Sequence, residues 1–114
     1  MKTIILSITI IGFGGDLSAA NEPHDLANGR LKYEETCVAC HGENGKPTIP
    51  GIPDFTSRKG PLQKTDDQLF KSIMDGVDRP EADMAMPALG GNPDLVEKDI
   101  KDILSYMREK FGKK

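Results

Sequence analysis

The chain has 114 residues, of which 37% are hydrophobic and 29% charged, and its formal net charge is −3 at pH 7. This length allows one domain. The slightly acidic balance argues against a nucleic-acid-binding protein, in which a basic stripe is the expected footprint. Because small domains bury little apolar surface, a chain without Trp is expected to need a crosslink, metal or cofactor in its core.

The first 20 residues predict a cleaved signal peptide. Lys2 gives a positive start, residues 4–13 are almost continuously apolar, and Ser18-Ala19-Ala20 supplies small residues for a signal peptidase. Cleavage after Ala20 leaves residues 21–114 as the mature domain, and the net charge stays at −3 because one basic and one acidic residue are lost. An uncleaved membrane anchor is the alternative, but such a helix needs about 20 apolar residues and glycines and Asp16 interrupt this run.

A short amphipathic helix is predicted within residues 23–36. Its apolar positions are Leu26, Ala27, Leu31 and Tyr33. Gly29 lies between them, and glycine inside a helix costs roughly 1 kcal/mol relative to alanine. Either Gly29 allows another helix to approach closely, or it is a neutral surface residue.

Residues 37–41, Cys37-Val38-Ala39-Cys40-His41, place two thiols and an imidazole within a single turn of backbone. This pattern is typical of covalent haem attachment. Two cysteines three positions apart point the same way on a helical turn, so each thiol can add to one vinyl group of the porphyrin. His41 is then placed to bind the iron from the proximal side. We therefore expect one haem c, bound through Cys37 and Cys40, in an exported protein of the periplasm.

Three other interpretations of this motif fit the sequence less well. A zinc site needs four protein ligands from Cys, His or carboxylate, but the chain offers no third or fourth cysteine and only one histidine besides His41, which is His24. A thioredoxin-type redox pair requires flanking strands, and no strand periodicity surrounds the motif. A disulfide between Cys37 and Cys40 would close a very short loop, which restrains the unfolded chain little.

Glycine and proline interrupt residues 42–61 so often that they predict a long loop. A loop of this length is unusual in a compact domain unless it wraps something, and the haem edge is the natural candidate. Thr65 and Gln68 then predict a capping box at the start of a helix. The apolar residues expected on its buried side are Leu69, Phe70, Ile73, Met74 and Val77, and Gly76 lies near its end.

A second loop is expected over residues 78–91. The last helix is predicted to begin at Asn92-Pro93, a cap followed by proline at the first helical position. Its apolar stripe consists of Leu95, Val96, Ile100, Ile103, Leu104, Met107 and Phe111, and Gly112 ends it. No segment alternates for long enough to predict a strand, so the expected fold class is all-α.

Four methionines outside the leader are candidates for the second face of a haem iron, where a thioether raises the reduction potential. Met74 and Met107 lie at helical spacing among apolar residues, which favours core packing. Met84 and Met86 lie in the second loop, and we favour Met86 because Pro87 stiffens the backbone beside it. Met84 as the ligand, or a face with no protein ligand, stays open as an alternative.

The chain resembles the monohaem class I c-type cytochromes over essentially all of residues 21–114. The residues that carry the resemblance are Gly29, Tyr33, the segment 37–42, Pro53-Asp54, Met86-Pro87-Ala88 and Leu104-Ser105-Tyr106. It implies three main helices and long loops around one covalent haem, with the first and last helices crossing at Gly29 and near Tyr106. It also implies that the carbonyl of Pro53, or alternatively of Pro50, accepts the ring proton of His41 and so orients the imidazole.

These features predict a single-electron carrier whose iron keeps both axial ligands, His41 and Met86. Its partners would be redox proteins that dock weakly at the haem edge in a salt-sensitive way, and a monomer is expected. Arg58 and Lys59 are expected to neutralise a haem propionate or to present a mildly basic face, unless they are ordinary solvated charges. Two alternatives stay open: a haem subunit of a larger oxidoreductase, and a haem enzyme or gas sensor with a displaceable sixth ligand.

Overall fold

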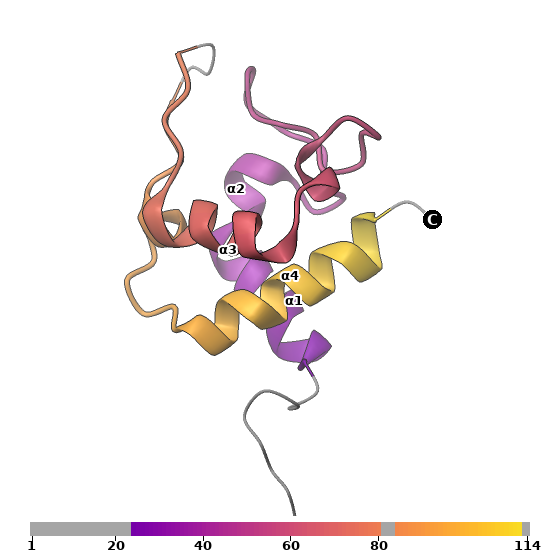
Figure 1. The fold of residues 1–114 in the computed structure, drawn as a ribbon, viewed down its shortest axis with the longest axis vertical. Coiled ribbons are helices and arrows are strands. Elements are labelled where there is room, and N and C mark those ends of the chain that lie inside the picture. Colours follow the sequence, from indigo (N-terminus) through magenta and orange to yellow (C-terminus); the bar gives the residue numbers. More distant parts are fainter. Residues whose placement is uncertain (1–23, 81–83, 113–114) are drawn as a thin grey trace, which may run out of the picture.

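The computed structural model describes residues 24–80 and 84–112, so the predicted signal peptide, residues 1–20, lies outside the described part. The helices in chain order are α1 (Leu26–Thr36), α2 (Val38–His41), η2 (Pro61–Gln63), α3 (Asp66–Asp75), η3 (Ala88–Gly91) and α4 (Glu97–Phe111), where η marks a 3-10 helix (Figure 1). The described residues contain no strand beyond an isolated bridge between Val77 and Met86. The expected all-α class is confirmed.

The N-terminal helix α1 and the C-terminal helix α4 cross at Gly29. A Cβ atom added to Gly29 would lie 2.1 Å from the carbonyl oxygen of Asp102, so only glycine fits at this crossing. One turn further along α1, the rings of Tyr33 and Tyr106 pack with their centroids 5.6 Å apart. Gly29 therefore allows the close approach of another helix, and the crossing lies at the two positions that the sequence resemblance implies.

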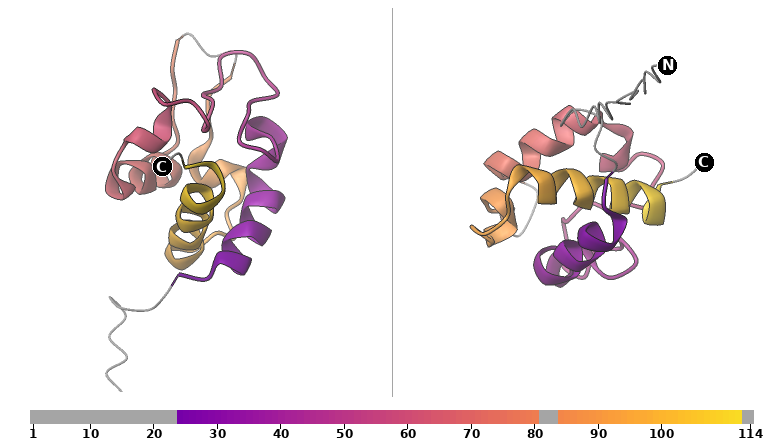
Figure 2. Two further views of the ribbon diagram at one scale, coloured as in Figure 1. Left: turned by 90° about the vertical axis from the view of Figure 1, so that its right-hand side faces the viewer. Right: turned by 90° about the horizontal axis from the view of Figure 1, so that it is seen from below.

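The middle helix α3 begins at the predicted capping box. The Thr65 hydroxyl accepts from the Gln68 backbone N–H at 3.2 Å, and the Gln68 side chain accepts from the Thr65 N–H at 3.0 Å. Leu69 is buried, and Phe70, Ile73 and Met74 pack partly buried against the core. Seen from two directions, α4 lies between α1 and α3 (Figure 2). α4 is therefore the central helix of the fold.

The start of α4 differs from the sequence prediction, because the helix begins at Glu97 and not at Asn92-Pro93. The carboxylate of Asp99 accepts from the backbone N–H of Val96 at 3.1 Å and so satisfies the helix start. Asn92 is used elsewhere, since its side chain donates to the Thr36 hydroxyl at 3.0 Å. Val96 consequently lies outside the buried stripe, with 59% of its surface exposed, and its predicted place in the core is wrong.

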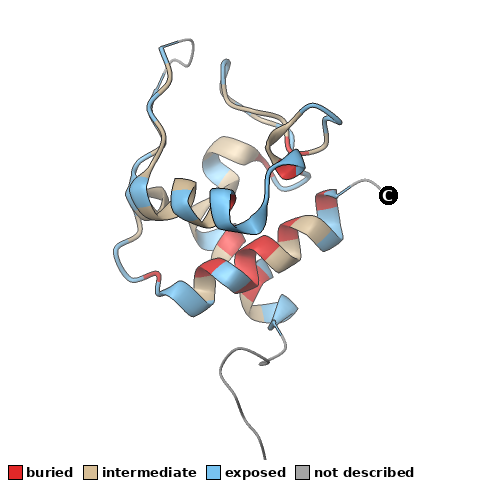
Figure 3. Ribbon diagram, viewed as in Figure 1, coloured by how far each residue is buried: buried red, intermediate tan, exposed pale blue. Residues whose placement is uncertain are grey.

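The core is concentrated along α4, where the helix faces α1 and α3 (Figure 3). The buried apolar residues are Tyr33, Phe55, Leu62, Leu69, Leu95, Ile100, Ile103, Leu104, Met107 and Phe111. Met107 is thus a core residue, as its spacing predicts. The helices of the described residues include none that is long and apolar enough to cross a membrane.

Candidate haem-binding site

The segment with the two thiols forms a single helical turn directly after α1. Cys37 is the C-terminal cap of α1, and its backbone N–H donates to the carbonyl of Tyr33 at 2.8 Å. The backbone N–H of His41 donates to the carbonyl of Cys37 at 2.9 Å, which closes the turn. Cys37 and Cys40 are free, half-buried thiols on this turn. The sequence motif is therefore presented as one rigid unit.

The electrostatics of this turn disfavour the other chemistries that two cysteines suggest. Burial raises the pKa of the Cys37 thiol to about 12, with a smaller contribution from Cys40. At neutral pH Cys37 is therefore a neutral thiol, whereas the nucleophile of a redox pair is a thiolate. Within residues 24–80 and 84–112, no three His, Cys, Asp or Glu side chains are grouped in a way that could hold a metal ion.

The imidazole of His41 packs against an aromatic ring, and one of its two nitrogens has no hydrogen-bond partner. Its ring stacks on Phe55, with centroids 4.3 Å apart and an interplanar angle of 21°. Burial lowers the pKa of His41 to about 4, so the ring is neutral at pH 7 and keeps a free lone pair. Nδ1 is buried without a hydrogen-bond partner, so the implied bond to the carbonyl of half-buried Pro53 is not formed here.

An orphaned buried nitrogen costs free energy unless something binds or accepts from it. A covalently attached haem requires two thiols for its attachment and an imidazole for its iron. This turn offers both, because it carries two free thiols and a neutral imidazole. The residues present therefore fit this group.

The loop after α2 folds back onto the motif and brings Phe55 to His41. The Thr48 hydroxyl donates to the carbonyl of Ala39, inside the motif, at 2.9 Å. The backbone N–H of Phe55 donates to the carbonyl of Gly45 at 2.9 Å. The first bond ties the loop to α2, and the second closes the loop on itself so that Phe55 reaches His41.

The second loop holds Met86 by its backbone on both sides. Val77 and Met86 exchange two hydrogen bonds, N–H of Val77 to O of Met86 at 2.9 Å and N–H of Met86 to O of Val77 at 2.7 Å. The sharp exit from α3 uses Gly76 at φ 80°, where a Cβ would lie 2.6 Å from the Met86 carbonyl oxygen. Met86 is half-buried, whereas Met84 is 48% exposed.

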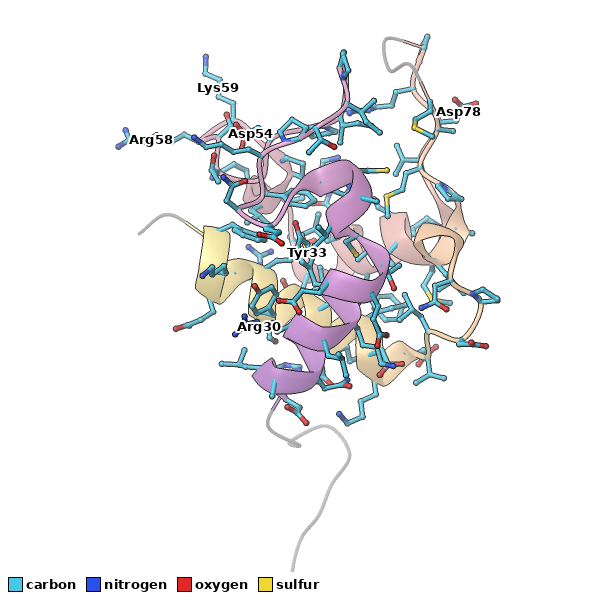
Figure 4. All side chains as sticks on the ribbon, turned by 180° about the vertical axis from the view of Figure 1, so that it is seen from behind. Arg30, Tyr33, Asp54, Arg58, Lys59 and Asp78 are labelled. Atoms are coloured by element: carbon cyan, nitrogen blue, oxygen red, sulfur yellow. The ribbon has the colours of Figure 1, made fainter. Side chains whose placement is uncertain are left out.

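The two basic residues singled out in the sequence, Arg58 and Lys59, are exposed and point outward near Asp54, while Asp78 lies at the opposite edge of the same end (Figure 4). The guanidinium of Arg79, in the second loop, donates to the carbonyl of Gly51, in the first loop, at 3.3 Å. The two loops therefore meet at this end of the molecule.

Sequence reasoning missed Phe55, which stacks on His41, and the bond from the Tyr33 hydroxyl to the carbonyl of Gly42. The one signal for Phe55 is its position as a lone aromatic residue in a loop of glycines and prolines. No local pattern reveals the hydroxyl bond, because it joins residues of two elements.

Comparison with known proteins gives one family and several relatives. The family described as "Cytochrome C oxidase, cbb3-type, subunit III" matches residues 24–107. Cytochrome c-555 of Prosthecochloris aestuarii is 32% identical over 95 residues, which cover 75% of this chain and 88% of that protein. Cytochrome c6 of Pyropia yezoensis is 34% identical over 107 residues, covering 90% of this chain and 84% of the relative. The fructose dehydrogenase cytochrome subunit of Gluconobacter japonicus is 32% identical over 93 residues, which are 75% of this chain but only 19% of that protein.

Proposed function

The chain belongs to the monohaem class I c-type cytochromes, and on this premise we propose that His41 and Met86 are the axial ligands of its haem. It is an electron-transfer protein that carries one covalently bound haem c. The haem iron, when bound, supplies the one-electron couple between its ferric and ferrous states. Cys37 and Cys40 attach the group by thioether bonds, which keep it on the chain in both states.

The observation that carries this proposal is the imidazole of His41, which stacks on Phe55 and lies on the same turn as two free thiols. Its orphaned Nδ1 is left for a backbone carbonyl, so the other ring nitrogen is left for the iron. His41 offers a neutral imidazole, and Phe55 restricts the tilt of its ring by stacking. We assign the carbonyl of Pro53 as acceptor of the remaining ring proton in the haem-loaded protein, because Pro53 is half-buried and lies two residues before Phe55. Such a bond fixes the ring and strengthens the ligand as a donor.

Met86 is the better candidate for the opposite face because its backbone is tied down. Its paired hydrogen bonds to Val77 limit its movement, and its side chain is half-buried. Met84 lacks this backbone pairing and is 48% exposed. A thioether held in place keeps the coordination shell full, which favours electron transfer over ligand binding.

Arg58 and Lys59 are proposed as the positive charges for a haem propionate or for an acidic partner. Both are exposed at the end of the molecule where the two loops meet. Partners are redox proteins that bind through a small and transient interface, so their affinity falls with salt. Residues 1–20 are proposed to direct export to the periplasm, where residues 21–114 act as a monomer.

The first experiment is the mass of the exported chain. We expect a polypeptide that begins at residue 21 and carries the extra mass of one haem after denaturation. Cys37→Ala with Cys40→Ala should yield a colourless chain of the same length. A wild-type chain that loses its colour on denaturation would contradict covalent attachment.

The second experiment separates Met86 from Met84. The weak absorbance at the red end of the spectrum that reports iron–thioether bonding should disappear in Met86→Ala and remain in Met84→Ala. Loss of the band in Met84→Ala alone would assign the ligand to Met84. A wild-type protein without the band would instead support a haem enzyme or gas sensor with an open sixth position.

A second candidate function is a haem subunit of a larger oxidoreductase. It is favoured by the match to the fructose dehydrogenase cytochrome subunit, of which the aligned residues are 19%. The native mass of the periplasmic protein separates the two functions, because a free carrier elutes at the mass of one chain and a subunit elutes with its complex.

A further inference from the structure

We propose that Tyr33 is a positioning residue for the axial imidazole: its hydroxyl anchors the backbone that follows His41 and thereby sets the rotation of the ring. The inference rests on the proposed ligation by His41. It concerns a residue of α1 that lies outside the attachment motif, four positions before Cys37.

The hydroxyl of Tyr33 makes one specific bond. It donates to the carbonyl oxygen of Gly42 at 2.7 Å, and Tyr33 itself is fully buried at 0% exposure. A buried phenol needs a partner, and burial raises its pKa, so it remains a donor at every physiological pH. The hydroxyl therefore stays protonated and able to donate to Gly42 at neutral pH.

The acceptor is the residue next to His41, at a point where the backbone has little freedom. Gly42 has φ 77° and ψ 157°, and a Cβ there would lie 2.2 Å from the carbonyl oxygen of Lys46. The Gly42 N–H already donates to the carbonyl of Val38 at 2.8 Å. With the Tyr33 bond, Gly42 is held at both its N–H and its C=O, which fixes the backbone from which the imidazole projects.

The ring of Tyr33 supports His41 by a second path. It packs on Phe111 at 5.4 Å between centroids, Phe111 stacks on Phe55 at 6.2 Å, and Phe55 stacks on His41 at 4.3 Å. The ring thus supports the face of the imidazole, and the hydroxyl supports its backbone. Figure 4 shows Tyr33 on α1, near the middle of the molecule.

Hydroxyl and ring can be separated by mutation. Tyr33→Phe keeps the ring contacts and removes only the bond to Gly42. Tyr106→Phe is the matched control, because Tyr106 belongs to the same aromatic cluster but its hydroxyl is not the one that binds Gly42. The readout is the set of haem methyl resonances in the NMR spectrum of the oxidised holoprotein, since their positions depend on the angle of the imidazole plane.

We expect Tyr33→Phe to shift these resonances, and with them the reduction potential, while Tyr106→Phe leaves both close to wild type. Losing one hydrogen bond changes a conformational equilibrium about fivefold, so a second imidazole orientation should become populated. Wild-type resonances in Tyr33→Phe, even with a lowered unfolding temperature, would show a purely structural role and overturn the inference.

A second test covers the case in which Tyr33→Phe does not mature with haem. The chain has only two tyrosines, so Tyr33 is the sole tyrosine of the Tyr106→Phe variant. Biosynthetic 3-fluorotyrosine then changes only Tyr33, making its phenol more acidic and a stronger donor. The resonances should shift in this protein relative to unlabelled Tyr106→Phe, and no shift would refute the proposal. A wild-type chain without a histidine-ligated haem would instead refute the proposed function itself.

Discussion

Asp102 is the buried charge on which the contact between α1 and α4 depends. Its side chain is on α4, the residue is 1% exposed, and it accepts from the backbone N–H of Asp25 at 2.9 Å, from the Asn28 amide at 2.9 Å and from the Lys98 ammonium at 2.6 Å. Burial alone would raise the pKa of Asp102, but these hydrogen bonds outweigh it and the pKa lies below the usual 3.8. The carboxylate therefore stabilises the fold in its charged form.

Asp102→Asn should lower the free energy of unfolding at pH 7 by about 2 kcal/mol, the usual scale for hydrogen bonds to a charged group. Because the folded pKa is depressed, the stabilisation is complete above pH 3.8 and is lost as the pH falls through the folded value. The difference between wild type and variant should thus shrink at acid pH. Denaturant titrations at pH 7 and pH 3 measure it.

The control for this variant is Asp75→Asn, which removes an exposed carboxylate paired with Lys71. An exposed ion pair contributes about 0–1 kcal/mol, so its effect at pH 7 should be small. A difference between wild type and Asp102→Asn that stays constant from pH 7 to pH 3 would show that the charge of Asp102 does not stabilise the fold.

For single residues, the sequence predicts the arrangement of side chains that are close together along the chain. Cys37, Cys40 and His41 lie in one turn, so their spacing alone predicts their common orientation. The stacking of Phe55 on His41 could not be predicted, because it depends on how a loop of glycines and prolines folds back onto α2. The position of Arg58 and Lys59 on the surface agrees with their charge, but their partners stay a prediction.

At the scale of the helices, α1 and α4 can cross closely because residue 29 is a glycine. Gly29→Ala would place a methyl group against the backbone carbonyl of Asp102, which cannot move without shifting α4. Overpacking of this kind costs typically 1–3 kcal/mol, and we expect a lower unfolding temperature of the holoprotein. Leu31→Ala on the same helix is the control, because Leu31 is 50% exposed; equal stability of Gly29→Ala and wild type would refute the tight crossing.

Gly76, at the C-terminal end of α3, gives a second prediction, because it packs against the backbone of the proposed ligand Met86. Gly76 and Gly91 have similar positive φ, 80° and 81°, but a Cβ on Gly76 would lie 2.6 Å from the Met86 carbonyl oxygen, whereas on Gly91 it would lie 3.5 Å from the Pro87 ring. Both alanine variants place a side chain at positive φ, and Gly76, with ψ 172°, lies in a region that is essentially restricted to glycine. Only Gly76→Ala displaces Met86.

We therefore expect Gly76→Ala to weaken the red absorbance band of iron–thioether bonding, and Gly91→Ala to retain it. Optical spectra of the two oxidised holoproteins measure this difference. If both variants keep the full band, the pairing of Val77 with Met86 does not hold the ligand in place.

The helices themselves follow from the sequence to different degrees. The capping box at Thr65 and the stripe from Ile100 to Phe111 are encoded locally, and both are confirmed. The start of α4 is not, because Asn92 bonds to Thr36 of α1 and the helix begins later, at a cap supplied by Asp99. Asn92, which local rules assign to the helix cap, is thus used in a tertiary contact with Thr36 instead.

On the scale of the whole molecule, most of the apolar core belongs to the helices, and within the described residues the loops 42–60 and 76–88 contribute only Phe55 to it. The buried side chains line α4 and its neighbours, while most of the described residues in the loops 42–60 and 76–88 are half-buried or exposed (Figure 3). Small domains of this size seldom hold such loops without a cofactor. The sequence predicts this dependence through its long loops and its lack of Trp.

We therefore expect the haem to complete the fold. The haem-free chain of Cys37→Ala with Cys40→Ala should retain helical circular dichroism from α1 and α4 but unfold over a broad temperature range, with fast amide exchange at Thr48 and Phe55. Met86→Ala is the control, because it removes one proposed ligand and leaves both thioether bonds, so its unfolding should remain cooperative. A sharp transition of the haem-free chain at the wild-type temperature would show instead that the loops fold without the cofactor, and that the haem is held by a structure already formed.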